Sequence, residues 1–230
     1  MAGRRSARGA LSRERILDAA LELIDQYGIE AFSMRRLGAH LGVDPMAVYH
    51  HVGGKRAIVL ALVERVFAGF DLPDTKGTWQ QQVRTWARAY RELALAHPGV
   101  VLQIVSDPEA VATAAVHVNE PLVAALRDAG LAPATVAAAI DVTVDYVHGA
   151  VLPAAARPSQ PGHSPPSLRS ELERHADERF PAQRWLLAEH GDEDGDAFEH
   201  GIDVIVAGLD ALLQAGTRAD HGRHRGQRVV

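Results

Sequence analysis

The side chains best suited to chemistry are concentrated between Phe32 and Arg56. Tyr49 and Lys55 offer a hydroxyl and an ammonium group, which suit contacts with DNA phosphates. Arg35 offers a guanidinium that can form a bidentate pair with the edge of a guanine. On two short neighbouring helices these groups suit recognition of duplex DNA rather than catalysis.

The first of these helices is predicted over residues 33–41. Ser33 is a good N-cap, and Leu37 and Leu41 form an apolar pair four residues apart. Gly42 follows directly and permits the left-handed turn that commonly ends a helix. The helix is therefore expected to end in a tight turn.

The second helix is predicted over residues 45–52. Asp44 suits the N-cap, and Pro45 suits the first helical position, where its missing N–H costs nothing. Val48 and Val52 point inward in this prediction. The residues expected to stay largely free are Met46, Ala47, Tyr49, His50 and His51. Two short helices joined by a glycine turn predict a helix-turn-helix, and the alternative is an αα-corner used only for packing.

Apolar residues recur at helical spacing along the rest of the chain, so the sequence predicts an all-α protein. Predicted helices cover residues 12–28, 33–41, 45–52, 55–70, 77–97, 108–129, 134–152, 169–189 and 197–215. The predicted organisation is a disordered basic arm (1–11), a three-helix helix-turn-helix DNA-binding domain (12–60), a larger helical ligand-binding and dimerisation domain (61–215) and a disordered tail (216–230). Residues 153–167 hold five prolines and are expected to form a mobile loop.

Composition excludes several classes of protein. The 230 residues contain no cysteine, so disulfides and thiolate chemistry are absent. Gly-x-Ser-x-Gly, P-loop and Gly-x-Gly-x-x-Gly patterns are missing, as is His-Glu-x-x-His, so no catalytic residue, metal site or cofactor is predicted. No apolar run suits a signal peptide or a membrane span, which predicts a cytoplasmic protein without a membrane partner.

Charge is distributed unevenly along the chain. Residues 1–65 carry ten basic and seven acidic side chains, a balance of +3, and the net charge of −5 leaves −8 on the remainder. A basic end on an acidic body is typical of a protein that meets a polyphosphate at one face. Chance variation in surface charge is the alternative.

The segment from Ile16 to Val66 resembles the DNA-binding domain of the TetR family of bacterial transcriptional repressors. The resemblance rests on Ala19-Ala20, Gly28, Leu37, Leu41-Gly42-Val43, Tyr49-His50-His51-Val52 and Lys55. It implies a homodimer that binds a near-palindromic double-stranded DNA operator. It also implies base contacts from Arg35, Pro45, Met46 and Ala47, phosphate contacts from Ser33, Tyr49, His51 and Lys55, and places for Asp44 and His50 in the same surface. Proline and methionine replace commoner polar residues, which favours apolar contact with thymine methyl groups.

The rest of the chain resembles the C-terminal domain of the tetracycline repressors, through Trp79, Gly149–Leu152, Asp196–Gly201 and Leu209. That resemblance implies a small-molecule effector, which in those repressors is a drug–magnesium chelate. The positions that hold the chelate are occupied here by Gly69 or Phe70, Trp86, Gln103 and Pro153, which are poor ligands for magnesium. We therefore expect a metal-free, more apolar effector, with pocket candidates Trp86, Tyr90, Gln103, His117, Tyr146 and His148.

Two apolar stripes are candidates for the dimer interface. They comprise Val136, Ile140, Val144 and Val147 in one helix and Ile202, Ile205, Leu209 and Leu212 in another. Two copies of each helix would form a four-helix bundle, unless the stripes only complete the core of one subunit.

Three functions are therefore considered. The first is a homodimeric repressor released by its effector. The second is an activator or a regulator without an effector. The third is a helical enzyme that uses the pairs around Asp145 and His148.

Overall fold

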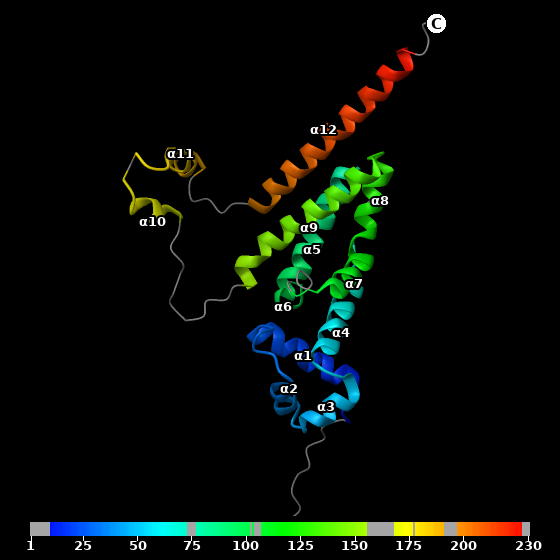
Figure 1. Cartoon of the computed structure of the whole chain (residues 1–230), viewed down its shortest axis with the longest axis vertical. Coiled ribbons are helices and arrows are strands. Elements are labelled where there is room, and N and C mark those ends of the chain that lie inside the picture. Colours follow the sequence, from blue (N-terminus) through cyan, green and yellow to red (C-terminus); the bar gives the residue numbers. More distant parts are fainter. Residues whose placement is uncertain are drawn as a thin grey trace, which may run out of the picture.

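The computed structural model describes residues 10–72, 77–101, 103, 107–155, 168–176, 178–190 and 197–226. Within these ranges the regular structure is entirely helical, as predicted (Figure 1). The helices are α1 (Arg13–Tyr27), α2 (Met34–Leu41), α3 (Pro45–Val52), α4 (Lys55–Ala68), α5 (Trp79–Ala96), α6 (Pro98–Val101), α7 (Pro108–Val118), α8 (Glu120–Asp128), α9 (Pro133–Ala155), α10 (Leu168–Glu173), α11 (Pro181–His190) and α12 (Ala197–Gly226).

Helices α1, α2 and α3 form a small domain at one end of the molecule, below α4 (Figure 1). The predicted caps are confirmed: the side chains of Ser12, Ser33 and Asp44 accept hydrogen bonds from the backbone N–H groups of Arg15, Arg36 and Met46. Gly42 adopts the left-handed conformation with φ 69°, which ends α2 and turns the chain into α3. Local sequence signals thus define the helix-turn-helix.

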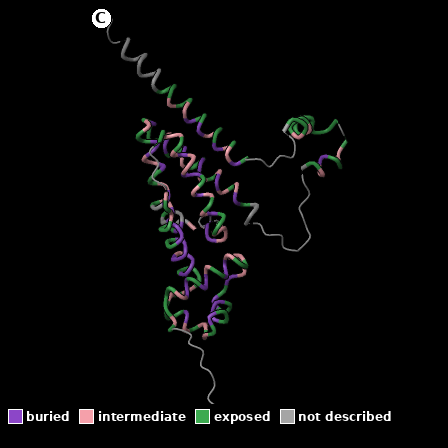
Figure 2. The backbone as a smooth tube through the Cα atoms, turned by 180° about the vertical axis from the view of Figure 1, so that it is seen from behind, coloured by how far each residue is buried: buried purple, intermediate pink, exposed green. Residues whose placement is uncertain are grey.

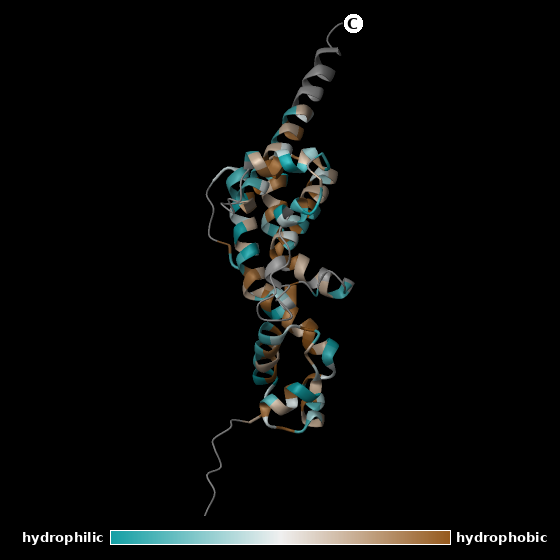
Figure 3. Cartoon of the chain, turned by 90° about the vertical axis from the view of Figure 1, so that its left-hand side faces the viewer, coloured by the Kyte–Doolittle hydropathy of each residue, from teal (hydrophilic) through white to brown (hydrophobic). Residues whose placement is uncertain are grey.

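A second, larger helical body is built around α5, which packs against α8, α9 and α12. Trp86 and Tyr90 of α5 are almost fully buried there, with relative exposures of 1% and 2%. The buried residues lie on the inward faces of the helices (Figure 2), and hydrophilic and hydrophobic residues alternate around them (Figure 3). The helices of this body thus bury apolar side chains against one another, and this burial holds the body together.

The two domains meet along α4 and α6. Helix α4 crosses the predicted boundary at residue 60 without a break and packs against both α1 and α7. Gly99 of α6 lies so close to Ile24 of α1 that an added Cβ would come within 2.8 Å of its Cγ2. His97 Nδ1 lies 2.9 Å from the Asp25 carboxylate across the same junction. The small domain of α1, α2 and α3, called the reading domain below, is thus packed directly onto the larger body.

Four predicted elements differ from the structure, and the short helix α6 was not predicted. The helix predicted over 108–129 breaks at Asn119, because Pro121 lacks the N–H that would continue the ladder. The helix predicted over 169–189 divides into α10 and α11, since Pro181 disfavours a helical residue before it.

The other two corrections extend helices. Helix α9 continues to Ala155, into the predicted 153–167 loop, because Pro153 removes only one hydrogen bond in the last turn. Helix α12 continues to Gly226, through most of the predicted disordered tail, since extending an existing helix is far easier than starting one. Parts of the predicted arm, loop and tail lie outside the described residues, namely 1–9, 156–167 and 227–230.

The apolar stripes predicted to form a dimer interface turn mostly inward. Val136, Val147, Ile202 and Leu209 are buried in the core of this chain, and Ile140, Val144 and Ile205 pack against it. The spacing was right, but α5 covers this face of both helices. Of the eight residues, Leu212 stays exposed; the other large apolar residues exposed on these helices are Val142, Leu152 and Val204.

Helix α9 is also apolar enough to be compared with a membrane span. Pro133–Leu152 passes by length and composition, with a mean hydropathy of 1.3. The same segment contains Asp141 and Asp145 and packs against α5, α8 and α12. Core helices of globular domains pass such a test, so this one helix is weak support for a membrane span.

Candidate DNA-reading surface and effector cavity

Helix α3 is anchored by one side chain and presents the others. Val48 is completely buried, whereas Met46 and Tyr49 are 61% and 44% exposed. His50 and His51 are exposed as well, and Pro45 and Ala47 are half-buried. The Asp44 carboxylate is occupied as the N-cap, where its Oδ1 accepts from Met46 N at 2.8 Å. The first turn and outer face of α3 therefore form a free surface.

Three further predicted contacts lie beside α3. Ser33 Oγ accepts from Arg36 N at 3.2 Å, so its hydroxyl serves first to start α2. Lys55 Nζ donates to the carbonyl oxygens of Ile29 and Phe32, both at 3.1 Å. An ammonium has three N–H groups, so one remains for a phosphate while two fix the α1–α2 connection.

Arg35 and its neighbour Arg36 have different environments. Arg36 stacks over the Tyr27 ring at 4.5 Å and donates to Ala31 O, which holds it against the domain. Arg35 is exposed, and its side chain makes neither a hydrogen bond nor an ion pair with the described part of the chain. Arg35 is therefore the guanidinium available to a ligand at this surface.

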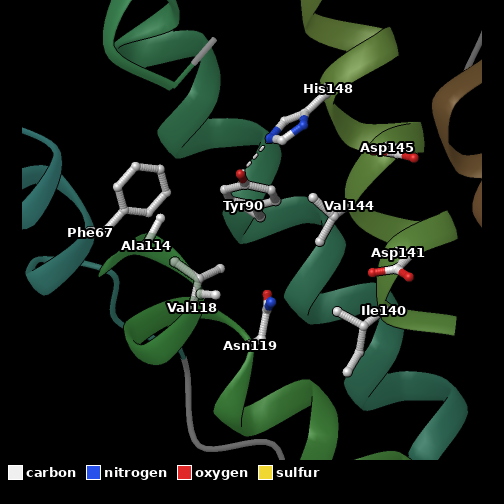
Figure 4. A pocket seen from close by; sticks show the side chains of 11 residues that line it. Phe67, Tyr90, Ala114, Val118, Asn119, Ile140, Asp141, Val144, Asp145 and His148 are labelled. Carbon is white, nitrogen blue, oxygen red and sulfur yellow. Dashed lines mark hydrogen bonds between the residues drawn. The ribbon is translucent and has the colours of Figure 1, made fainter. Parts of the chain in front are cut away.

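A cavity of about 500 Å³ lies in the larger body between α4, α5, α7 and α9 (Figure 4). Its lining residues are Phe67, Tyr90, Ala114, Ala115, Val118, Asn119, Ile140, Asp141, Val144, Asp145 and His148. The volume falls within the range of small-molecule sites, roughly 300–1,000 Å³. Apolar walls with a few polar groups are also typical of such sites.

Tyr90 and His148 join two walls of this cavity. The Tyr90 hydroxyl lies 2.6 Å from His148 Nε2 (Figure 4). Burial lowers the pKa of His148, an effect that the nearby Asp145 charge partly opposes, and burial raises the pKa of Tyr90. The arrangement thus favours a neutral imidazole that accepts the tyrosine proton in a hydrogen bond.

Of the six predicted pocket residues, Tyr90 and His148 line the cavity. Trp86 lies behind Tyr90, with ring centroids 5.1 Å apart, and its Nε1 donates to Val118 O at 2.7 Å. Tyr146 faces α12, where its hydroxyl donates to the carbonyls of Ala197 and Phe198 at 3.0 and 3.1 Å. Gln103 is partly buried and is not among the lining residues, and the side chain of His117 lies outside the described part of the structure.

Sequence reasoning missed most of the lining. Asp145 was named only for a possible enzyme. The predicted pocket residues did not include Asp141, Phe67 or Asn119. One signal was available: Asp141, Asp145 and His148 recur at spacings of four and three, which places them on one helical face. The residues from α4 and α7 gave no such signal, because their meeting depends on tertiary packing.

The chain is similar to known regulators over most of its length. Residues 16–62 match the bacterial regulatory proteins of the tetR family, and residues 72–213 match the tetracyclin repressor-like C-terminal domain. Tetracycline repressor protein class D of Escherichia coli is 28% identical over 211 residues, covering 89% of this chain and 92% of that protein. HTH-type transcriptional repressor DrrR1 of Streptomyces coeruleorubidus is 27% identical over 227 residues, covering 92% and 83%.

Solved structures agree with these relationships. The TetR family protein ActR of Streptomyces coelicolor, in complex with actinorhodin, superposes with a TM-score of 0.69 at 27% identity. The superposition covers 88% of this chain and 98% of that one. These relatives are transcriptional regulators rather than enzymes.

Proposed function

This chain belongs to the TetR family of bacterial regulatory proteins, and we propose that it is a cytoplasmic, homodimeric repressor that a small organic effector releases from a palindromic operator. The observation that carries the proposal is the pairing of a free reading helix at one end with a ligand-sized cavity in the body. Asp145 and His148 belong to the cavity in this proposal, and no catalytic role is assigned to them.

The DNA contacts are proposed for the exposed surface of α3 and its neighbours. Met46 and Ala47 at the head of α3 would contact thymine methyl groups, and Arg35 would contact a guanine edge. Tyr49, His51 and the remaining N–H of Lys55 would contact phosphates. The exposure of Met46 and Tyr49 in a domain with a positive charge balance supports this assignment.

The dimer interface is proposed for the outer faces of α9 and α12. On α12 the exposed Val204 and Leu212 are separated by small residues, namely Ala207, Gly208 and Ala211. On α9 the exposed Val142 and Gly149 occupy one face. Large exposed apolar residues interleaved with small ones suit close helix packing, so two copies would bury both faces in a four-helix bundle.

The dimer is tested by sedimentation of the full chain. Val204→Asp combined with Leu212→Asp is expected to convert a species of about twice the 24.8 kDa chain mass into a monomer. Leu95→Asp on α5, where Leu95 is 39% exposed, is the matched control and should remain dimeric. A wild-type monomer at micromolar concentration would refute the homodimer.

The effector is proposed to bind the cavity without a metal ion. ActR binds actinorhodin, which supports an organic ligand for the corresponding body of this chain. Phe67, Tyr90 and Val118 make one side of the cavity apolar, and the partly exposed Ile140 and Val144 add apolar surface that a ligand can contact. Such a ligand releases DNA only if it binds more tightly to the dimer conformation that cannot bind the operator than to the conformation that can.

The experiment that tests this function is recovery of the fragments that the protein retains from its own genomic DNA. We expect a small set of near-palindromic sites whose binding weakens steeply as salt rises, because phosphate neutralisation releases counterions. Flat salt dependence would refute DNA binding. Transcription from a retained site, with and without the protein, separates a repressor from an activator.

A further inference from the structure

Two carboxylates line one wall of the effector cavity. Asp141 and Asp145 lie four residues apart on α9, so they project from the same face in successive turns. Figure 4 shows both on the α9 side, beside Ile140 and Val144. Within the described residues neither carboxylate has a hydrogen bond or an ion pair with a cationic side chain. Both side chains are exposed to solvent, so they can pair with a ligand that enters the cavity.

The opposite side of the cavity is apolar and aromatic. Phe67 comes from α4, Tyr90 from α5, and Ala114 and Val118 from α7 (Figure 4). Tyr90 is backed by the ring of Trp86, which limits its movement. This wall is apolar and closely packed, because its side chains are only 1–4% exposed, and it has few groups that can hydrogen-bond.

The residues that line the cavity provide little positive charge to neutralise the two carboxylates. They include neither lysine nor arginine, and burial lowers the pKa of His148, which favours its neutral form. A negatively charged ligand would thus meet repulsion from Asp141 and Asp145 without compensation. Three metal-binding side chains do not come together anywhere in the described residues, so the carboxylates are better suited to an organic cation than to a metal ion.

We propose that the effector is an amphiphilic cation, in which a flat apolar ring system carries a protonated amine. Its rings would lie against Ile140 and Val144, which are partly exposed in the cavity, and its ammonium would lie between Asp141 and Asp145. The Asn119 side-chain oxygen is a further acceptor on the same cavity. This inference rests on the proposed function only in taking the cavity as the effector site.

Three pyrene probes test the charge preference on the full chain. They are 1-pyrenemethylamine, which is a cation, 1-pyrenemethanol, which is neutral, and 1-pyreneacetate, a carboxylate that is an anion. Because the ring and its methylene linker are the same in all three, fluorescence titration compares the charge of the head group. We expect the amine to bind about tenfold tighter than the alcohol, and the carboxylate to bind weakest, because two carboxylates act together on one ammonium even though solvent weakens each pair.

Variants then locate the preference. Asp141→Asn combined with Asp145→Asn should weaken the amine about tenfold and leave the alcohol unchanged within about twofold. Glu92→Gln, at an exposed position of α5 that does not line the cavity, removes one negative charge and is the control. It should keep the wild-type preference.

Other outcomes overturn the inference. Equal binding of the amine and alcohol, tighter binding of the carboxylate, or a preference that survives the double substitution would each refute the cation site. Absence of binding by all three probes would also refute it. The wild-type comparison needs no variant, so a misfolded variant cannot obscure the result. Operator retention and its salt dependence are measured without these probes, so the proposed function can stand if the cation site fails.

Discussion

Arg56, in the first turn of α4, forms an ion pair with Asp107, the N-cap of α7. Arg56 Nε lies 3.2 Å from Asp107 Oδ2, and Arg56 Nη2 lies 2.8 Å from Glu109 Oε2. The preceding residue, Lys55, holds the α1–α2 connection, whereas α7 lines the cavity through Ala114, Ala115 and Val118. This contact therefore links the reading domain directly to a helix of the cavity wall.

Breaking that link is expected to weaken the coupling between ligand and DNA. Asp107→Asn combined with Glu109→Gln keeps a good N-cap but removes both charges that pair with Arg56, so ligand-driven release should need several-fold more ligand. Direct ligand binding and DNA binding without ligand should each change by less than about twofold, because neither site is touched. Operator-release titrations measure the effect, with Arg127→Gln, which breaks an exposed pair with Asp128, as the control. An unchanged release curve for the double variant would contradict the link.

The second prediction separates two kinds of DNA contact. Tyr49→Ala should weaken operator and random DNA alike, because a phosphate contact carries no sequence information. Arg35→Ala should mainly reduce discrimination, at about 1–3 kcal/mol on the operator. Titration of both DNAs at one salt concentration measures this, with Arg127→Ala in the larger body as the control. Equal losses on both DNAs for Arg35→Ala would remove Arg35 from the base-contacting set.

The third prediction concerns pH and His148. Burial lowers the pKa of His148 below its ordinary value of 6.5, so between these two values the unfolded chain binds more protons at this residue than the folded one. The folded state therefore loses stability as pH falls below about 6.5. Melting temperatures between pH 7 and pH 5 should fall more for the wild type than for His148→Gln, which cannot titrate there. Parallel curves would show that His148 is not buried as a neutral group.

The fourth prediction tests how α9 and α12 pack. A Cβ at Gly201 would overlap the Tyr146 phenol, which stacks on Phe198 with ring centroids 5.6 Å apart. Gly201→Ala should lower the free energy of unfolding by about 1–3 kcal/mol, because the ring must move. Gly216→Ala, which meets no atom within 4 Å, is the control and should be neutral or stabilising. Denaturant unfolding measures both, and an equally stable Gly201→Ala protein would contradict this packing.

The fifth prediction is that tetracycline with magnesium does not release this protein from its operator. Phe70, Trp86 and Tyr90 form a cluster in which Phe70 contacts both other rings edge-on, at centroid distances of 6.4 and 6.3 Å. By the resemblance to the tetracycline repressors, Phe70 and Trp86 occupy positions that hold the chelate in those proteins, and neither supplies an oxygen or imidazole ligand for magnesium. An operator-release titration at saturating magnesium tests this. Magnesium-dependent release at micromolar tetracycline would show that the cavity holds the chelate after all.

The sequence by itself determined the reading domain. Helix starts and turns there depend on Ser33, Gly42 and Asp44, and each of these residues acts on neighbours within two to five positions. Such local effects can be predicted from the order of the residues alone. Val48 follows the same logic, because its spacing from the cap decides which face of a short helix is buried. The effects of Pro121 and Pro181 are local as well. They explain the two helix breaks that the prediction did not include.

Only the tertiary structure decided the effector cavity and the free faces of α9 and α12. Phe67, Val118 and Asp141 lie far apart in the chain and meet because α4, α7 and α9 pack around α5. An apolar stripe at helical spacing shows that a face is buried, but not whether it meets its own core or a second subunit. Ile202 and Val204 illustrate this, since they are two residues apart, of similar hydrophobicity, and 1% and 63% exposed. The difference between them arises from which side of α12 packs on the body, and that is a property of long-range packing.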